Sequence, residues 1–327
     1  MKNLETIFAG LTLANPIVAA SCSLTGTAQS NKMIAEAGVG AIVLKSLFEE
    51  DIARETAALA DSMMHSEGAD YMQAYIASDA LNSYINLIKE SKALCGETPI
   101  IASINCHTSG QWAEYAKAIE AAGADALELN VMTIESSANS EDGELERRHI
   151  EIAKSVCGSI QIPVIVKLGA MVSNHVSLVA RLAACGVGGF VMFNRSYQTD
   201  IDIETMSYTR GTVLSSASDF ATPMRYIAIT SAALPKVSLA HSGGVQGGEC
   251  VIKALLAGAA TVEVCSTLYR SGGVKEWVDG VKREIEEWQS EKGYESIGEF
   301  RGAMCNSDEH SDEVVRAQFL KHFGAYR

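Results

Sequence analysis

The stretch "ACGVGGFVMF", residues 184–193, contains the arrangement that decides the fold. A helical pattern ends, a glycine turns the chain, and an apolar run starts almost at once. The same arrangement recurs in "EAGVGAIV" (36–43), "AAGADALEL" (121–129) and "LAGAATVEV" (256–264). Glycine favours the left-handed conformation that commonly ends a helix. These four stretches therefore predict helices that lead directly into strands.

Eight short runs rich in Val, Ile, Leu and Ala are candidate strands. They occupy residues 15–21, 41–46, 99–104, 126–131, 163–168, 189–194, 236–242 and 261–266. Near-continuous apolarity is typical of parallel strands that are covered on both faces. Amphipathic stretches such as 109–123, 143–158 and 247–259 lie between these runs and predict helices.

Eight strands that alternate with helices predict an α/β fold of the (β/α)8 type, a TIM barrel. We expect a single domain over residues 1–327, because such barrels commonly reach this length. An open, doubly wound sheet is the alternative, and the count of eight strands argues against it.

Two connections are too long for simple loops. Residues 47–80 follow the second strand, and residues 195–220 follow the sixth. Both leave from the carboxyl end of a strand, which is the active face of such a barrel. We therefore expect insertions that form lids or substrate walls, with a decorative role as the alternative.

The composition narrows the choice of partners and compartment. A net charge of −14 disfavours a nucleic acid or an anionic membrane as partner. Glu5 precedes any apolar run, and no run of about 18 apolar residues follows, so we expect a soluble cytoplasmic protein. The eight cysteines form no C-x-x-C pair, which predicts free, buried thiols and no metal or iron–sulfur site.

Polar residues stand at the carboxyl ends of the candidate strands. They are Ser21, Lys45, Ser46, Asn105, Asn130, Lys167 and Asn194. Lysine is almost never fully buried without a partner. Lys45 and Lys167 therefore each require an anion or an electron-rich ring, unless they are strand-edge lysines that reach solvent.

Two glycine-rich stretches predict a phosphate site. The seventh strand ends in "HSGGVQGGE" (241–249) and the eighth in "EVCSTLYRSGG" (263–273). Barrels commonly bind phosphate at the loops after these two strands. Gly243 and Gly244 would let backbone N–H groups approach the anion. We expect His241, which precedes them, to be a packing residue.

The ordered motifs resemble those of the dihydroorotate dehydrogenases, chiefly the class 1 cytosolic type. They are "NPIVAAS", "VLKS", "LELN", "PVIVKL", "FN", "SGG" and "GYESIGEF". The resemblance covers nearly the whole chain and implies an FMN-dependent barrel that oxidises dihydroorotate to orotate in pyrimidine biosynthesis. It also implies a cytoplasmic homodimer acting on a small-molecule substrate, with an electron acceptor that the sequence leaves open.

The resemblance implies which residues hold the FMN. They are Ala20, Ser21, Lys45, Ser46, Asn105, Asn130, Lys167, Asn194, Ser216, Gly243, Gly244, Cys265 and Ser266. Lys167 would face the N1–C2=O edge of the flavin, where a cation stabilises the reduced ring. The family usually has glycine at position 265 and near Cys22 and Ser216, so these positions depart from its pattern.

The catalytic base is implied to lie three residues past Asn130. Family members carry "N-x-x-[C/S]-P-N" here, and this chain carries "NVMTIE", residues 130–135. Thr133 therefore takes the position of the base, which removes a substrate proton while a hydride leaves for flavin N5. A hydroxyl needs an adjacent acceptor or a water chain to act as a base. Lys45 is the second implied catalytic residue.

The same comparison implies the substrate-binding residues. They are Lys45, Asn130, Glu135, Asn194 and Arg195. Glu135 replaces an asparagine and would repel an anionic substrate by roughly 1–4 kcal/mol at about 4 Å. Arg195 stands where the family has serine or threonine, and it would offset Glu135 or bind an acidic substrate itself.

Three other functions stay open at this point. One is an FMN oxidoreductase that acts on another, uncharged dihydropyrimidine-like ring. A second is a catalytically impaired paralogue that binds flavin without turning over a substrate. A third is a flavin-free lyase that uses Lys45 or Lys167 as a Schiff-base amine, which would leave the other polar strand ends without a role.

Overall fold

Eight parallel strands close into a barrel in the computed structural model, which describes residues 2–48, 69–105, 112–132, 134, 136–196, 198–305 and 314–315. In chain order they are β3 (Ile17–Ala19), β4 (Ala41–Val43), β6 (Ile100–Asn105), β7 (Ala126–Asn130), β8 (Val164–Gly169), β9 (Gly189–Asn194), β12 (Ser238–Ser242) and β13 (Thr261–Val264). Pairing of β13 with β3 and of β4 with β6 completes the circle. The predicted (β/α)8 barrel is confirmed.

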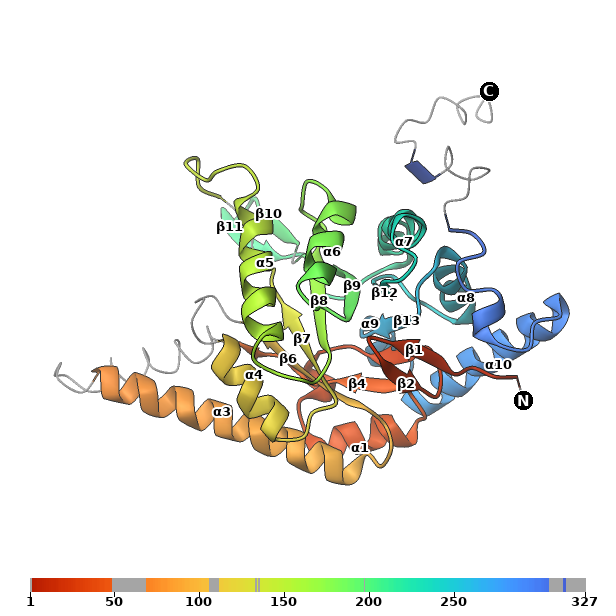
Figure 1. The fold of residues 1–327 in the computed structure, drawn as a ribbon, viewed down its shortest axis with the longest axis horizontal. Coiled ribbons are helices and arrows are strands. Elements are labelled where there is room, and N and C mark those ends of the chain that lie inside the picture. Colours follow the sequence, from red (N-terminus) through yellow and green to blue (C-terminus); the bar gives the residue numbers. More distant parts are fainter. Residues whose placement is uncertain are drawn as a thin grey trace.

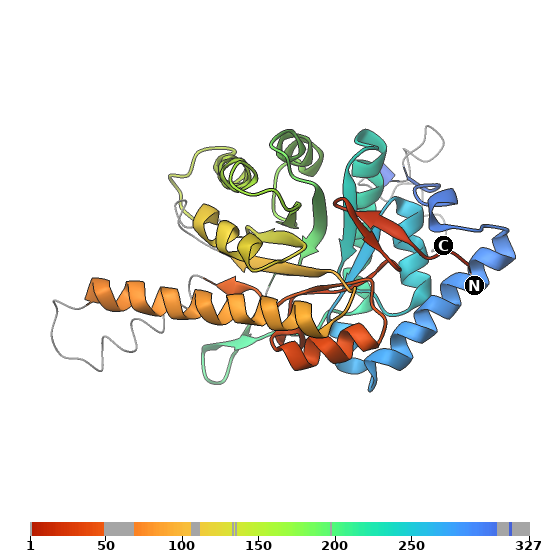
Figure 2. The same ribbon diagram turned by 60° about the horizontal axis from the view of Figure 1, so that its bottom comes forward.

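A helix follows each barrel strand and covers the outside of the barrel (Figures 1 and 2). In chain order these helices are α1 (Ala28–Glu36), α3 (Ala69–Leu94), α4 (Trp112–Ala121), α5 (Glu144–Cys157), α6 (His175–Ala184), α7 (Ala221–Ala233), α8 (Gly248–Ala257) and α10 (Val274–Lys292), and the short α9 (Ser266–Arg270) precedes α10. Gly258 ends α8 with φ +115°, and Gly186 follows α6 with φ +101°. The predicted turns from helix to strand are therefore present.

Apolar side chains fill the barrel at the amino ends of its strands. The hairpin of β1 (Thr6–Phe8) and β2 (Leu11–Leu13) closes this end, where Phe8 and Leu13 are buried with Val43, Ile101 and Ile165. Successive residues of one parity face the same side of a strand. The next interior-facing position lies two residues further along each strand. At these positions β6, β7, β8 and β13 carry buried polar side chains, namely Ser103, Glu128, Lys167 and Glu263.

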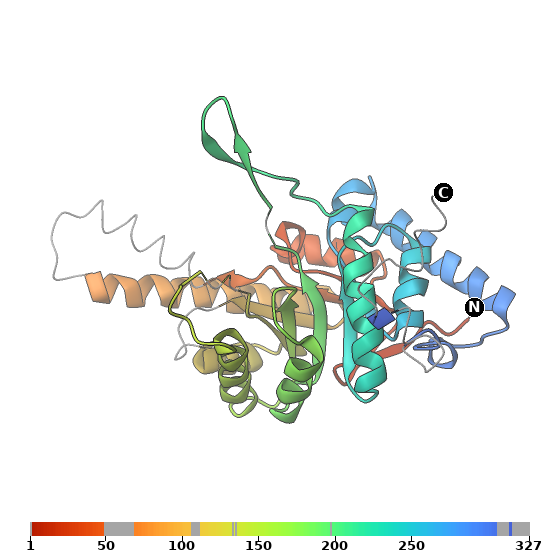
Figure 3. The same cartoon turned by 90° about the horizontal axis from the view of Figure 1, so that it is seen from above.

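The two predicted insertions begin after the carboxyl ends of β4 and β9. The first begins with β5 (Leu47–Phe48), which pairs with β6, and residues 49–68 lie outside the described part. The second contains the antiparallel hairpin of β10 (Thr199–Asp202) and β11 (Ser207–Arg210), followed by the 3-10 turn η2 (Ala217–Asp219). Figure 3 shows this hairpin projecting away from the barrel. Its apolar residues Ile203 and Met206 are 81% and 88% exposed.

Candidate active site

Two adjoining cavities open at the carboxyl ends of the barrel strands. Their volumes are about 270 and 460 Å³, and Ser21, Lys167 and Asn194 line both. Every barrel strand contributes a lining residue, either from its last positions or from the loop that follows it. The site is thus built where barrels of this type carry their active sites.

Most of the residues predicted from the sequence line these cavities. In the first cavity they are Ala20, Ser21, Lys167, Asn194, Arg195, Gly243, Gly244, Cys265 and Ser266. In the second cavity they are Ser21, Lys45, Ser46, Asn105, Asn130, Lys167 and Asn194. Arg195, expected beside a substrate, lies in the first cavity with the glycine loop.

Three predicted residues are not placed among the lining residues. Thr133 and Glu135 lie outside the described part of the chain, although their neighbours Met132 and Ile134 line the second cavity. Ser216 does not line either cavity, and its hydroxyl lies 2.8 Å from the Ser218 hydroxyl. His107, another residue past the third barrel strand, also lies outside the described part.

The glycine loop after β12 forms one wall of the first cavity. Gly243 and Gly244 have φ angles of +116° and +70°, a region that L side chains rarely adopt. A Cβ atom at Gly244 would lie 2.4 Å from the backbone nitrogen of Phe220. Gly244 is therefore required both by its conformation and by the close approach of the chain before α7.

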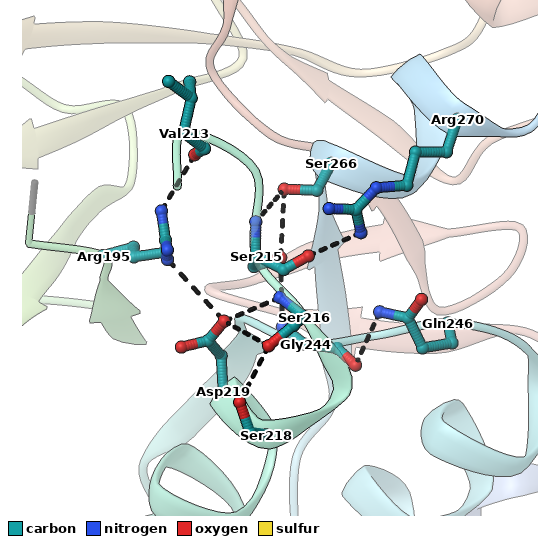
Figure 4. A network of polar contacts seen from close by, with 10 residues as sticks. All are labelled: Arg195, Val213, Ser215, Ser216, Ser218, Asp219, Gly244, Gln246, Ser266 and Arg270. Carbon is teal, nitrogen blue, oxygen red and sulfur yellow. Dashed lines mark hydrogen bonds and ion pairs between the residues drawn. The ribbon is translucent and has the colours of Figure 1, made fainter. Parts of the chain in front are cut away.

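Hydrogen bonds to serine hydroxyl groups link the glycine loop to two other loops of the first cavity, as Figure 4 shows. The Ser215 amide donates to the Ser266 hydroxyl at 2.8 Å, and the Gly244 amide donates to the Ser215 hydroxyl at 3.4 Å. The Arg270 guanidinium donates to the Ser215 carbonyl at 2.6 Å. Ser215, which the sequence did not single out, thus joins the loops after β9, β12 and β13.

Arg195 is held at the base of the β10–β11 insertion. Its Nη1 donates to the Val213 carbonyl at 2.8 Å, and its Nε lies 3.7 Å from the Asp219 carboxylate. The side chain is 23% exposed, so both charges are partly screened by solvent. Arg195 therefore contributes a positive charge to the first cavity from a fixed position.

A buried charged group forms the floor between the two cavities. The Lys167 Nζ donates to the Glu263 Oε2 at 2.5 Å and lies 3.7 Å from the Glu128 Oε1. Glu128 and Glu263 are 1% and 3% exposed, and Lys167 is 7% exposed. Lys167 is therefore paired within the barrel and does not reach solvent as a strand-edge lysine would.

Burial and neighbouring charge set the protonation of this group. Burial, and then the Glu263 carboxylate, raise the pKa of Glu128 well above its ordinary value, despite the opposing effect of Lys167. Burial alone would lower the pKa of Lys167, but Glu128 and Glu263 outweigh it and raise that pKa. The group therefore holds Lys167 as an ammonium ion, and it makes Glu128 bind a proton more readily than an exposed glutamate does.

Glu128 brings buried oxygens to the second cavity, and one of them lies 3.7 Å from the Lys167 Nζ, beyond ordinary hydrogen-bond distance. Neither of its buried oxygens has a hydrogen-bond partner among the described residues, and Glu128 lines the second cavity. Buried polar groups normally find partners. Glu128 is thus placed to hydrogen-bond a ligand in that cavity.

Side chains of neighbouring strands are linked around the second cavity. The Ser46 hydroxyl lies 3.0 Å from the Ser21 hydroxyl and 2.7 Å from the Ser103 hydroxyl, and the Ser103 amide donates to the Tyr84 hydroxyl. The Asn194 amide nitrogen donates to the Asn130 oxygen at 2.7 Å. These contacts fix the polar groups at the strand ends before any ligand binds.

Lys45 differs from Lys167 in its surroundings. It lines the second cavity, its side chain is exposed, and it has no ion-pair partner among the described residues. An unpaired ammonium at a cavity wall can bind an anion or donate hydrogen bonds to the polar edge of a ligand. Lys45 is therefore the free cation of the second cavity within the described part.

Residues outside the cavities have structural roles. His241 is fully buried, its Nε2 lies 3.2 Å from the Phe220 carbonyl, and burial lowers its pKa to about 4. The expectation that it is a packing residue is confirmed.

The described cysteines are free thiols, but apart from Cys95 they are half-buried rather than buried, because they lie at element ends and cavity walls.

The first cavity fits a phosphate-bearing ligand. Its walls offer backbone amides of a glycine loop, the hydroxyls of Ser266 and Thr267, and the Arg195 guanidinium. Among its described lining residues the one carboxylate is Glu263, which pairs with Lys167. The second cavity adds amides, hydroxyls and the Lys45 ammonium, which suit a planar ring with polar edges.

The described residues hold no group of three or more His, Cys, Asp or Glu that could bind a metal ion, and none of their helices is long and apolar enough to cross a membrane.

The fold and site define a (β/α)8 barrel with a polar cavity at the loops after its last two strands, where barrels of this type commonly bind phosphate. The family model for dihydroorotate dehydrogenase matches residues 3–288, and the chain belongs to this family of oxidoreductases. The resemblance read from the motifs is thereby confirmed.

Three relatives carry the name dihydroorotate dehydrogenase B (NAD(+)), catalytic subunit. The protein of Thermoplasma volcanium is 26% identical, with 92% of this chain and 98% of the relative covered. The protein of Caldicellulosiruptor saccharolyticus is 25% identical, with 92% and 98% covered. The protein of Methanosarcina mazei is 26% identical, with 90% and 92% covered.

Proposed function

We propose that the chain is an FMN-dependent oxidoreductase that oxidises dihydroorotate to orotate, a step of pyrimidine biosynthesis. The observation that carries this proposal is the meeting of the family-matched residues of all eight strands around two adjoining cavities. One cavity suits a phosphate and the other a planar ring, which together suit a flavin mononucleotide and a small cyclic substrate.

The residues of the first cavity would hold the FMN phosphate. Gly243 and Gly244 bring the chain close without side chains, and Ser266 adds a hydroxyl at the start of α9. Arg195 would add a positive charge, which an anion of this kind requires. Lys167, Asn130 and Asn194 would contact the polar edges of the ring, since they stand between the two cavities.

When bound, FMN supplies the acceptor for a hydride from the substrate. Lys167 would face the ring as half of an ion pair with Glu263, so its charge is largely compensated. Lys45, Ser46 and Asn130 would orient the substrate ring in the second cavity. Thr133 would remove the substrate proton, with its hydroxyl proton passed to an acceptor or to water.

Dihydroorotate carries a carboxylate, and Lys45 would bind it, since it is the cation of the second cavity within the described part that has no ion-pair partner there. Glu135 would oppose that binding through its own charge. An uncharged dihydropyrimidine is therefore the second candidate substrate, favoured by the glutamate in "NVMTIE". A third possibility that fits the sequence of this loop is a catalytically impaired paralogue that binds flavin.

The ion pairs of Lys167 argue against Lys167 as the amine of a Schiff-base lyase. A Schiff base requires a neutral amine, and the two carboxyl groups raise the pKa of Lys167. The cavity residues also include amides and a glycine loop that a Schiff-base reaction would not use. A bound flavin would use both the charged Lys167 and these amides and glycines.

We further propose a cytoplasmic enzyme that works as a homodimer or with a second subunit. The relatives named as catalytic subunits belong to enzymes that include another chain, and they are named for NAD. The net charge of −14 gives no support for a nucleic acid or an anionic membrane as partner.

Two measurements test the proposed function. When FMN is added to the purified chain, binding should quench the flavin fluorescence. A protein that is colourless after unbound FMN has been removed would refute every function that involves a flavin. Dihydroorotate mixed anaerobically with the loaded protein should bleach the flavin absorbance. Bleaching by dihydrouracil alone would reassign the substrate, and no bleaching by either would favour the impaired paralogue.

A further inference from the structure

One ion pair of the site crosses the interior of the barrel. Lys167 lies on β8 and Glu263 on β13, and two other barrel strands, β9 and β12, separate them in the sheet. The Lys167 Nζ donates to the Glu263 Oε2 at 2.5 Å across this distance. The contact therefore joins opposite parts of the barrel wall, and it holds the ammonium beside Glu263.

This ion pair is part of the surface that a ligand would meet. Both residues line the first cavity, and Lys167 also lines the second cavity together with Glu128. Each of these three residues is at most 7% exposed. Solvent and salt screen buried charges less than exposed ones. A ligand that fills the two cavities would therefore experience the charges of this group more strongly than those of the protein surface.

The total charge of the group follows from its composition. It contains one ammonium and two carboxyl groups, and the ion pair of Lys167 with Glu263 sums to zero. Glu128 adds no charge when it holds a proton and one negative charge when it does not. The group is therefore neutral or negative in either state of Glu128. Glutamine in place of Glu263 would make it more positive.

Reduction changes the charge of the ligand that we propose for these cavities. A flavin that accepts a hydride gains two electrons and one proton, so its ring gains one negative charge until a second proton binds. A positive charge near the ring favours this reduced form, whereas a cancelled charge does not. The partner of Lys167 thus influences which form of the flavin the site binds more tightly.

We propose that Glu263 tunes the reduction potential of the bound flavin, because it cancels the positive charge of Lys167 and so lowers the affinity of the site for reduced FMN relative to oxidised FMN. Glu263 is a positioning residue in this role, since it acts through the ammonium that it holds. The inference rests on the proposed FMN site. Its consequence is a bound flavin that is a stronger reductant toward the electron acceptor.

Glu128 makes the expected effect of losing Glu263 smaller. After burial, Glu263 is the largest cause of the raised pKa of Glu128. A Glu263→Gln variant lacks this cause, so Glu128 gives up its proton more readily and restores part of the lost negative charge. The Glu128 carboxylate lies 3.7 Å from the Lys167 Nζ, against 2.5 Å for Glu263, so it offsets the ammonium less completely. It also leaves Lys167 with one carboxyl partner, so the variant should fold.

The reduction potential of the FMN-loaded, full-length chain tests the proposal. Anaerobic titration with dithionite beside a reference dye measures this potential, and comparison with free FMN gives the ratio of the dissociation constants of oxidised and reduced FMN. Glu263→Gln should raise this ratio about tenfold, which is about 30 mV upward for a two-electron couple. Glu263→Asp keeps the carboxylate and should stay closer to the wild type. An unchanged or lower potential in Glu263→Gln would overturn the proposal.

Two further variants separate charge from other effects. Glu128→Gln is the buried match, and it should raise the ratio less than Glu263→Gln, because Glu128 is farther from the ammonium and holds a proton more readily. Asp279→Asn is the exposed match. Its ion pair with Lys275 at 2.9 Å lies on α10, outside both cavities, so its loss should leave the potential unchanged. A rise in either variant as large as that of Glu263→Gln would overturn the role of Glu263.

The wild type provides a measurement that needs no variant. With the charge of Lys167 cancelled, its site should bind oxidised FMN as tightly as reduced FMN or more tightly. A preference for reduced FMN of more than about tenfold would overturn the proposal and leave the proposed flavin function intact. A chain that binds neither form would overturn both, so the two failures are distinguishable.

Discussion

Replacement of Glu128 with glutamine tests the buried charge group directly, because it removes a proton-binding group while it keeps the shape. Glu128 is 1% exposed, and its pKa is raised above the ordinary value of 4.5. The folded protein therefore binds more protons than the unfolded chain at any pH between 4.5 and the raised pKa of Glu128 in the folded state. The free energy of unfolding of the wild type then falls as pH rises, by up to about 1.4 kcal/mol for each pH unit.

The Glu128→Gln variant lacks this loss, so we expect it to gain on the wild type as pH rises above about 4.5. Glu263→Gln should behave differently. It removes a partner 2.5 Å from Lys167 and leaves Glu128 at 3.7 Å. At an effective dielectric constant of about 20, the two Coulomb energies differ by about 2 kcal/mol. Glu263→Gln should therefore be less stable than the wild type at neutral pH by about that amount.

Urea unfolding at several pH values, followed by circular dichroism, measures these differences. Glu249→Gln is the control, because Glu249 is exposed and its pKa is lowered by Lys253. The stability contributed by Glu249 is present above its unfolded pKa and is lost only as pH falls below it, so the control and the wild type should run parallel above pH 5. A Glu128→Gln profile parallel to the wild type over this range would show that Glu128 is ionised in the folded protein and refute the reasoning.

Three further changes test the site. Gly244→Ala should weaken FMN binding at least tenfold in a fluorescence titration, because its Cβ would meet Phe220, whereas Gly272→Ala, with φ +67° and open space, should bind FMN normally; equal binding by both would contradict the role of the glycine loop. Thr133→Ala should keep FMN binding and lose flavin reduction by substrate by 10²-fold or more, and Thr133→Ser should retain it; full activity of the alanine variant would remove Thr133 from the mechanism. Glu135→Asn should tighten orotate binding about tenfold, as titration of the flavin spectrum measures, since it removes a like charge; unchanged affinity would count against repulsion by Glu135.

The barrel could be predicted because each of its units is encoded locally. The run "PVIVKL" is apolar enough to be buried on both faces wherever it is placed, and the glycine after α6 turns the chain without help from distant residues. The hairpin of β10 and β11 was not predicted as strands. Its apolar residues alternate, yet Ile203 and Met206 stay exposed, so the alternation there reports no buried face.

The contacts inside the site could not be predicted, because they depend on how the strands are staggered. Glu128 in "LELN" and Glu263 in "TVEV" each look like a single polar residue in an apolar strand. They meet at Lys167 only because β7 pairs with β8 in the register that sets Asn130 opposite Lys167 and because the sheet then closes. A polar residue two positions before a predicted site residue was the available signal for Glu128.

The insertion between β9 and α7 leaves the cavity at Arg195 and returns to it at Ser215. The hydrogen bond from the Arg195 guanidinium to the Val213 carbonyl links the two ends of this insertion. A segment whose ends are already tied together can be exchanged for a longer or shorter one at small entropic cost. Residues 198–212 could therefore be replaced by a new recognition segment beside the first cavity, while the barrel and its glycine loop stay as they are.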